Sequence, residues 1–237
     1  MSTTATITLR PAAERGRTLI DWLDSKHTFS FGQYQDADHM GYRTLRVIND
    51  DVIAPGMGFG EHPHRDMEIL TWVLKGQLQH RDSLGNGGII TPGTLQYMTA
   101  GSGIRHSEFN ASKKELVHLL QIWILPRERS LSPNYGQASF TPEQRDNQWC
   151  TVASPDGRDG SITIQQDAVM SVANLSKGRT LSQNIAEGRH LFLHVARGKV
   201  KLADHTLASG DAAAISDCTN LSVTAEEDSE ILLFDLA

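Results

Sequence analysis

The sequence predicts an all-β protein of two barrels in tandem. Two observations lead to this fold class: the apolar runs are short, and one unit of sequence occurs twice. Runs of β-branched and large apolar residues are bounded by Gly, Asp, Asn or Pro, with turn signals about every 8–12 residues. This spacing is typical of antiparallel sandwiches and barrels, and stretches of helical periodicity are scarce.

The expected strands fall into two sets along the chain. The first set lies in the N-terminal half and comprises Leu45–Ile48, Glu68–Leu74, Gly88–Thr91, Leu95–Met98 and Leu116–Leu125. The second set lies in the C-terminal half and comprises Ile162–Gln165, Leu191–Ala196, Lys199–Leu202, Ala212–Ile215, Leu221–Val223 and Ile231–Phe234. One stretch, Glu14–Leu23, is instead expected to form one or two helical turns.

A two-strand unit is repeated between the halves. In the first half, Trp72–Leu78 contains an apolar strand, a Lys-Gly pair and a second strand, and the Gly-led strand Pro92–Met98 follows. In the second half, His194–Val200 has an Arg-Gly pair in the same place, and Ser209–Ile215 follows. The reuse of one supersecondary unit indicates two similar domains.

The break between the repeats sets the expected domain boundaries. Prolines and polar residues interrupt the apolar pattern over Pro126–Gln148, which is typical of a connecting segment. We therefore expect an N-terminal barrel over residues 1–130 and a C-terminal barrel over residues 145–237. A chain of 237 residues is long enough for each barrel to bury its own core.

Charge and cysteine content exclude several function classes. Lys and Arg total 22 against 28 Asp and Glu, so the net charge is −6 and no basic block is present to bind nucleic-acid phosphates. Cys150 and Cys218 form no CxxC pair, which favours a reducing, cytoplasmic setting over a thiolate zinc site. The longest mostly apolar stretch, Leu116–Leu125, is too short to span a membrane, and Met1–Leu19 lacks the apolar core of a secretion signal.

Two doublets of potential metal ligands stand out, His62 with His64 and His106 with Glu108. Alternate residues of a strand share a face about 6–7 Å apart, so each doublet can direct two donors at one point. If the two strands are neighbours, three imidazoles and one carboxylate converge and leave up to two positions open on a six-coordinate ion. This donor set suits a first-row divalent ion and is the kind found in non-haem Fe(II) oxygenases.

The other seven histidines are expected to be hydrogen-bonded or solvated. They are His27, His39, His80, His118, His190, His194 and His205. His118 alternates with apolar neighbours and is a candidate for a position next to the metal ligands.

The residues around the doublets resemble the two cupin motifs. Gly56–Glu68 has a Gly, five residues, the HxH doublet, three residues and a Glu, and Gly103–Asn110 resembles the second motif. More narrowly, several segments are similar to the signatures of the pirin family: Trp22–Phe31, Leu45–Asp50, His62–Glu68, Met98–Glu108 and Ser154–Ser161. The resemblance implies a bicupin, two jelly-roll barrels of the double-stranded β-helix type, with the metal in the N-terminal barrel.

The resemblance also implies an activity. Bacterial pirins are similar to quercetin 2,3-dioxygenases, which open the flavonol ring with O2 and release carbon monoxide, whereas animal members are described as iron-dependent nuclear co-regulators. We therefore expect a dioxygenase that takes a quercetin-like flavonol and O2 and uses one divalent transition metal ion. Fe(II) is the first choice and other divalent metals stay open. No direct contact with nucleic acid or membrane is expected.

Two other functions are kept as alternatives. One is an iron-containing regulatory or sensor protein that acts through a protein partner. The other is a purely structural metal, which is disfavoured because structural sites are usually closed by four protein ligands and rich in Cys.

The acidic ligand has two candidates. General cupins take it from the first motif, here Glu68, whereas pirins take it from the second, here Glu108. Glu68 shares strand parity with His62 and His64, so alternation alone does not exclude it. We expect Glu108 to bind the metal and, if it swings off the metal, to act as the base that removes the flavonol 3-hydroxyl proton. Glu68 is expected to line the site or to be solvated at its rim.

The repeat predicts no metal site in the second barrel. Counted from the turn glycines of each repeat, the positions that correspond to the four candidate ligands are Asn184, Ala186, Val223 and Ala225. No ligand pair stands at these positions, so the C-terminal barrel is expected to lack the metal.

Overall fold

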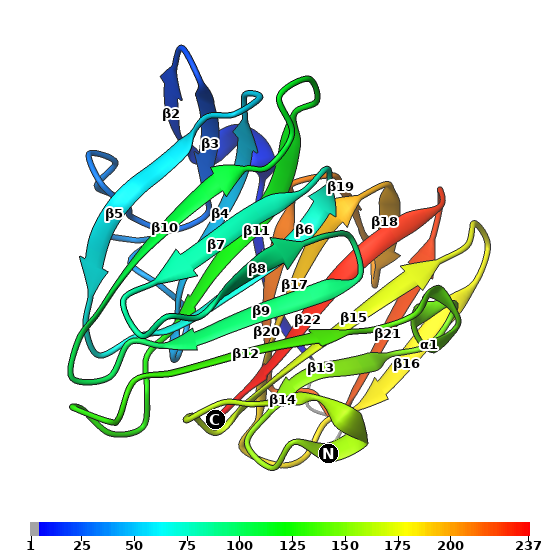
Figure 1. Ribbon diagram of the computed structural model, residues 1–237. Helices are drawn as coiled ribbons and strands as arrows, with labels where there is room; N and C mark the ends of the chain where they lie inside the picture. Colours follow the sequence, from blue (N-terminus) through cyan, green and yellow to red (C-terminus); the bar gives the residue numbers. More distant parts are fainter. Residues whose placement is uncertain (1–4) are drawn as a thin grey trace. The chain divides into compact units, whose positions relative to one another are not determined.

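A computed structural model describes residues 5–237, whose regular secondary structure is almost entirely β-strand (Figure 1). The chain divides into two compact units. The first unit comprises residues 16–139 and 164–166, and the second comprises residues 5–15, 140–163 and 167–237. Each unit contains one seven-stranded and one four-stranded sheet, which confirms the all-β fold class and the two barrels.

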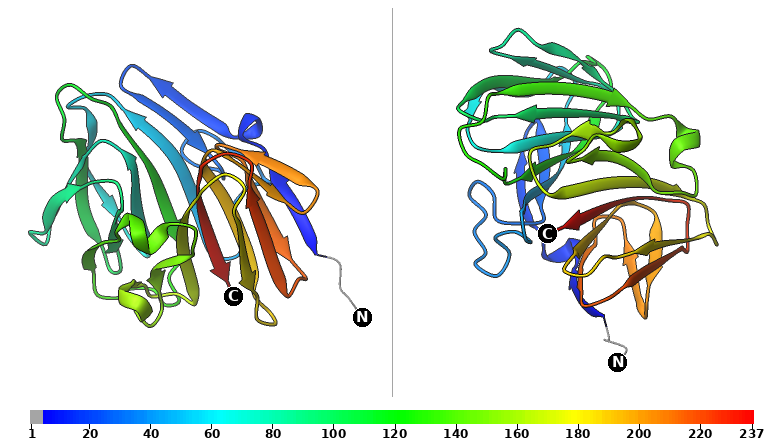
Figure 2. Two further views of the ribbon diagram at one scale, coloured as in Figure 1. Left: turned by 90° about the vertical axis from the view of Figure 1, so that its right-hand side faces the viewer. Right: turned by 90° about the horizontal axis from the view of Figure 1, so that it is seen from below.

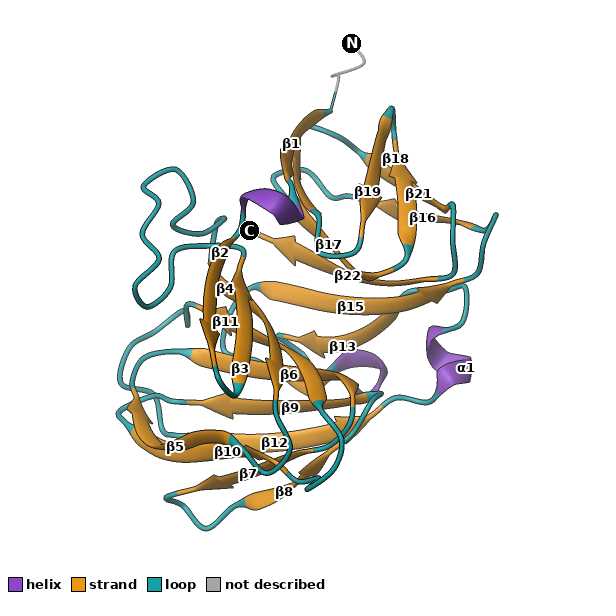
Figure 3. Ribbon diagram, turned by 90° about the horizontal axis from the view of Figure 1, so that it is seen from above, coloured by secondary structure: helices purple, strands orange, loops and turns teal. Residues whose placement is uncertain are grey.

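The first unit is a sandwich of two antiparallel sheets (Figure 3). Its seven-stranded sheet contains, in spatial order, β12 (Asn134–Ser139), β9 (Thr94–Thr99), β6 (Glu68–Lys75), β11 (Val117–Ile124), β4 (Leu45–Ile53), β3 (Leu23–His27) and β2 (Gly16–Ile20). Its four-stranded sheet contains β5 (Gly58–His64), β10 (Ile104–Asn110), β7 (Leu78–Asp82) and β8 (Gly87–Ile90).

The second unit repeats this plan. Its seven-stranded sheet contains β1 (Thr6–Arg10), β20 (Ala212–Ser216), β17 (His190–Arg197), β22 (Ser229–Leu236), β15 (Ala168–Leu175), β13 (Cys150–Ser154) and β14 (Ile162–Thr163). Its four-stranded sheet contains β16 (Thr180–Asn184), β21 (Asn220–Ala225), β18 (Lys199–Leu202) and β19 (His205–Ala208). The helical elements of the described chain are α1 (Pro142–Arg145) and two 3₁₀ segments, Ala12–Glu14 and Arg158–Gly160.

The first strand of the chain, β1, belongs to the second unit. The expected division into residues 1–130 and 145–237 places it in the first. β1 pairs with β20 from Thr6 opposite Ser216 to Arg10 opposite Ala212, and Figure 2 shows it beside the orange strands of that unit. β12 lies beyond residue 130 but pairs with β9 of the first unit. Strand pairing across long sequence distances therefore sets the boundaries, and local composition does not reveal it.

The helical turns expected over Glu14–Leu23 are wrong. This stretch enters a hairpin in which β2 pairs with β3, with Ile20 opposite Leu23. The Arg17 Nε atom donates to the Asp24 Oδ1 atom across the two strands at 2.8 Å. Cross-strand pairing of this kind overrides a weak local helical signal.

Alternate residues of the first unit's strands point between its two sheets. Apolar residues from both sheets form one buried cluster there, which includes Leu23, Ile53, Leu78, Ile90 and Leu119. Because side chains alternate along a strand, the same faces of β4, β6 and β11 also direct polar residues inward: Asn49, Asp51, Thr71 and Gln121. The interior is therefore apolar at one end and polar where the functional cavity lies.

The repeated turn glycines have nearly the same backbone in both units. Gly76 and Gly198 both have φ of 81°, and Gly93 and Gly210 have φ of 84° and 88°. A Cβ atom at Gly76 would lie 2.6 Å from the Leu116 carbonyl oxygen and 2.9 Å from the Val117 Cα atom. The turn thus requires glycine for both its dihedral angle and its close contact with backbone.

We expect Gly76→Ala to destabilise the protein more than Gly85→Ala. Both positions have positive φ, and left-handed strain costs each alanine roughly 1–2 kcal/mol of unfolding free energy. No heavy atom lies within 4 Å of the Cβ position at Gly85, so only Gly76→Ala adds a steric clash. Urea unfolding should show the larger loss for Gly76→Ala, and equal losses would contradict the close contact.

Candidate metal centre

Three histidines converge inside the first unit. β5 positions His62 and His64, and β10 positions His106 directly opposite His62 in the strand register. Their ring centroids are 4.5 to 4.8 Å apart, and one ligand atom from each ring lies within 4.8 Å of the others. The structure therefore brings together three of the four residues expected to bind the metal.

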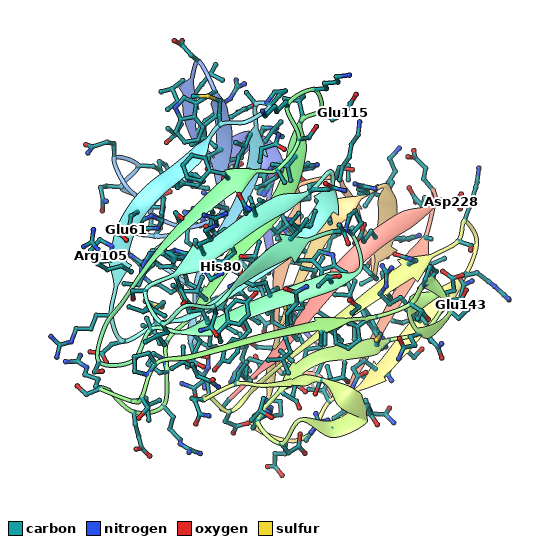
Figure 4. All side chains as sticks on the ribbon, viewed as in Figure 1. Glu61, His80, Arg105, Glu115, Glu143 and Asp228 are labelled. Atoms are coloured by element: carbon teal, nitrogen blue, oxygen red, sulfur yellow. The ribbon has the colours of Figure 1, made fainter. Side chains whose placement is uncertain are left out.

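The outward faces of the same strands are charged. Arg105 donates from its Nε atom to the Glu61 Oε1 atom at 2.8 Å, and Figure 4 shows these two side chains together where β5 and β10 pair. Glu61 and Arg105 are the neighbours of His62 and His106 in sequence. Strand alternation thus separates a solvated ion pair from the inward-facing imidazoles.

Hydrogen bonds orient two of the imidazoles toward a common ligand. The His62 Nδ1–H group donates to the Gly60 carbonyl oxygen at 2.7 Å, which leaves the lone pair on Nε2. His106 is 1 % exposed, and its Nδ1 atom lies 3.1 Å from the His80 Nε2 atom. The His106 Nε2 atom is buried without a hydrogen-bond partner, a costly state that a metal ion would relieve.

Two of the three imidazoles, His64 and His106, have the protonation that a metal requires. Burial, together with the charges of His106 and His62, lowers the pKa of His64 to about 3. Burial, together with the charges of His62 and His80, likewise lowers the pKa of His106 to about 3. Both rings are therefore neutral near pH 7 and offer lone pairs to a cation.

His80 is a neighbour of the site that the sequence patterns did not indicate. It lies on β7 (Figure 4) and is fully buried. Its ring stacks on Tyr135 with ring centroids 5.1 Å apart. The register places it opposite Glu108. His80 supports the orientation of His106, and only the β7–β10 pairing reveals this role.

His118 does not lie next to the metal ligands, contrary to the expectation. Its Nε2 atom lies 2.6 Å from the Asp50 Oδ1 atom. Its neighbour Leu119 belongs to the buried cluster between the sheets, so His118 points to the opposite face of β11.

Glu108 points inward but stands outside the group of three histidines. It is 3 % exposed and lines the cavity beside them. The Gln121 Nε2 atom donates to Glu108 Oε2 at 2.8 Å, and the Thr71 hydroxyl donates to Glu108 Oε1 at 3.3 Å. The pKa of the Glu108 carboxyl group is raised above its usual value, because the effect of burial exceeds the lowering by His80 and by these hydrogen bonds.

Glu68 neither lines the site nor lies at a solvated rim, so both expected positions are wrong. Thr71 on the same strand faces Glu108, so Glu68 points to the other face of β6. There it is fully buried and accepts hydrogen bonds from the Tyr97 hydroxyl and from the Gln165 backbone N–H group at 2.9 Å. The parity shared with His64 is lost because Asp66, with φ of 49°, interrupts the strand between them.

A cavity of about 470 Å³ opens beside the histidines, within the range of roughly 300–1,000 Å³ typical of small-molecule sites. Phe31, Phe59 and Trp123 contribute aromatic surface to it. Trp123 packs against His64 with ring centroids 5.0 Å apart. The cavity therefore joins the imidazole group to a surface suited to a flat aromatic ligand.

The second unit has aliphatic residues at the positions that correspond to His106 and Glu108. Asn110 pairs with Leu78 in the first unit, and Ala225 pairs with Val200 in the second. This register makes Leu221 the counterpart of His106 and Val223 that of Glu108, two residues earlier than the count from the turn glycines. Both side chains belong to a buried apolar cluster. Among residues 5–237, the three histidines of the first unit form the group suited to a metal.

Two family models match the two halves of the chain. Residues 8–124 match the family model described as pirin, and residues 151–236 match that of the quercetinase C-terminal cupin domain. A quercetin 2,3-dioxygenase from Escherichia coli strain K12 is 47% identical over 230 residues, which cover 97% of this chain and 98% of that protein. The chain belongs to the pirin family.

Solved structures extend the likeness to this pirin's three-dimensional fold. The crystal structure of YhhW from Escherichia coli is similar with a TM-score of 0.94 and 47% identity, covering 98% of both chains. A structure of bacterial pirin YhhW in complex with nickel(II) has a TM-score of 0.93 and covers 98% of this chain and 99% of that one. A putative quercetin 2,3-dioxygenase from Mycobacterium tuberculosis strain H37Rv is 43% identical over 98% of this chain and 96% of its own length.

The helices of residues 5–237 are too short or too polar for any of them to cross a membrane.

A second buried carboxyl group, Asp51, lines the cavity. Its side chain is 3 % exposed, and burial raises its pKa to about 7 despite a hydrogen bond from Ser25. The charges of Asp50, Glu108 and Asp24 raise this pKa further. An unfolded aspartate has a pKa of about 3.9, so the folded protein holds an extra proton between about pH 4 and pH 7.

This proton makes stability depend on pH. Because the folded state binds more protons than the unfolded state, the Asp51 contribution to the unfolding free energy falls as pH rises from about 4 through 7. We expect Asp51→Asn to remove this dependence and to gain up to a few kcal/mol relative to the wild type between pH 5 and pH 8. Urea unfolding at pH 5 and at pH 8, with a chelator present, measures the unfolding free energy of both proteins. The prediction is contradicted if the difference in unfolding free energy between Asp51→Asn and the wild type is the same at the two pH values.

Proposed function

We propose that this pirin is a metal-dependent quercetin 2,3-dioxygenase that opens the ring of a flavonol with O2 and releases carbon monoxide. One observation carries the proposal: three imidazoles, one with a buried and unpartnered Nε2 atom, converge beside a cavity with aromatic walls. The 47% identity to a quercetin 2,3-dioxygenase over nearly the whole chain supports it.

The proposed ligands are His62, His64, His106 and Glu108, and the proposed ion is Fe(II). Neutral imidazoles with one carboxylate suit several first-row divalent ions, and the nickel(II) complex of a relative supports a site of this kind. Glu108 shares the inward face of β10 with His106. We assign Glu108 as the fourth ligand because it lines the same cavity as His62 and His64.

When bound, a divalent ion supplies the Lewis acidity that favours the deprotonated form of the flavonol 3-hydroxyl group. Glu108 accepts the proton of that hydroxyl as the general base. The amide of Gln121 holds the Glu108 carboxyl group in place, and Thr71 contacts both residues at 3.1 to 3.3 Å. This network keeps the base oriented toward the cavity.

The aromatic wall binds the substrate and excludes water. Phe31 packs edge-to-face on Trp123 with ring centroids 5.4 Å apart, and Trp22 does the same on Phe59 at 5.2 Å. Such pairs are rigid and bury large apolar area. A flat flavonol held against them keeps its reactive ring beside the histidines and away from bulk water.

We expect His62→Ala to lower both metal content and turnover. Removing a ligand should reduce metal affinity by more than the roughly 10–100-fold cost of losing a supporting residue. Metal analysis of the purified variant and oxygen uptake with quercetin measure the two effects. His118→Ala is the matched control, because it removes an imidazole from the face of β11 that is turned away from the cavity. Full turnover by His62→Ala would overturn the ligand assignment.

A pair of glutamate variants tests the acidic ligand. We expect Glu108→Gln to lower kcat by about 10²–10⁴-fold, the usual contribution of a general base. Glu68→Gln should keep both metal content and turnover, because Glu68 lies on the far face of β6. The opposite pattern would assign the role to Glu68.

The activity itself is tested with iron-loaded wild-type protein and quercetin. Oxygen uptake with an equal amount of carbon monoxide is the expected result. If fully metal-loaded protein shows neither, the enzyme proposal fails, and the regulatory alternative replaces it.

A further inference from the structure

Two residues that line the cavity each carry a buried polar atom with no partner within the protein. One atom is in the Trp123 indole Nε1–H group, a donor, and the other is the Asp51 Oδ1 atom, an acceptor. Both atoms are buried, although buried polar groups are normally hydrogen-bonded. A ligand that offers an acceptor to Trp123 and a donor to Asp51 would satisfy both.

The two atoms occupy different parts of the cavity. Trp123 packs on His64 and therefore lies at the metal end. Asp51 lies on β4, where it pairs with Leu119 of β11 and Ser25 of β3, two residues from Asn49. The cavity is thus bounded by histidines of β5 in one sheet and by the carboxyl group of Asp51 on β4 in the other sheet.

The polar neighbours of Asp51 are already satisfied by one another. The His27 Nδ1–H group donates to the Asn49 Oδ1 atom at 2.8 Å, and the His27 Nε2 atom lies 2.9 Å from the Thr18 hydroxyl. Gln121 is engaged with Glu108. Among these side chains, only Asp51 has a buried oxygen without a protein partner. Asp51 lines the cavity, so a ligand held there is the available source of the missing hydrogen bond.

We propose that Asp51 binds a phenolic hydroxyl group on an aromatic ring of the substrate remote from the metal, and so selects polyhydroxylated flavonols. The inference rests on the proposed function for the identity of the ligand. Ser25 is a positioning residue that holds the carboxyl group through its hydroxyl.

The surroundings favour a phenol over a cation as the occupant. Leu23, Phe59 and Phe31 line the same cavity, and among residues 5–237 the group of potential metal ligands contains only the three histidines. A pKa of about 7 lets the carboxyl group accept a phenolic hydrogen when ionised and donate to a phenolic oxygen when protonated. A flat polyphenol between aromatic walls meets both conditions.

The test compares quercetin with 3-hydroxyflavone, which keeps the reacting hydroxyl and lacks the hydroxyls of both outer rings. Binding of each to metal-loaded protein is measured by calorimetry under nitrogen, and kcat/KM is measured in air. We expect Asp51→Leu, which has the same branched shape and makes no hydrogen bond, to weaken quercetin binding about 10–100-fold and 3-hydroxyflavone binding less than about 3-fold. The wild type should prefer quercetin.

Asp50→Leu is the matched control. Asp50 precedes Asp51 on β4 but points to the opposite face, where it contacts His118. It should leave the binding ratio of the two flavonols unchanged. If Asp51→Leu does not fold, Ser25→Ala replaces it and should reduce quercetin binding selectively, by about 3–10-fold.

The outcomes separate this inference from the proposed function. Equal losses for both flavonols, or no loss for either, would overturn the role of Asp51 even if turnover persists. If quercetin binding depends on Asp51 but the wild type consumes no oxygen, the binding site stands and the dioxygenase function fails.

Discussion

The register of β5 against β10 is the constraint on which the functional site depends. It places His62 opposite His106, so that one pair of antiparallel strands brings three imidazoles to one point. A shift by one residue would turn every imidazole to the outer face, where Glu61 and Arg105 form an ion pair. The register shift between His106 and Glu108 places Phe59, a wall of the cavity, opposite Glu108.

The facing sheet completes the site with residues of a different kind. Its inner surface holds a polar row, in which Thr71 and Gln121 support Glu108 and Ser25 supports Asp51. Burying two carboxyl groups in one cavity raises the pKa of each, which is costly unless function uses them. In the second unit the counterpart of Glu108 is Val223, which lies in an apolar core and carries no such cost.

Much of the fold was predictable because strand signals are local. The repeat predicted two units, and the glycines at its turns have matching dihedral angles. The hairpin of β2 and β3 was missed because its stability comes from cross-strand contacts such as Arg17 with Asp24. The placement of β1 was missed because its partner β20 lies about two hundred residues along the chain, with Thr6 opposite Ser216.

The sequence by itself determined the all-β class, the repeat and the doublets that contain His62, His64, His106 and Glu108. Alternation along a single strand is a local rule, so it can be derived from spacing. Only the tertiary structure decided that Glu68 faces away, that His80 supports His106, and that Asp51 reaches the cavity. These facts depend on a break at Asp66 and on pairing between distant strands, and neither has a signature in local sequence.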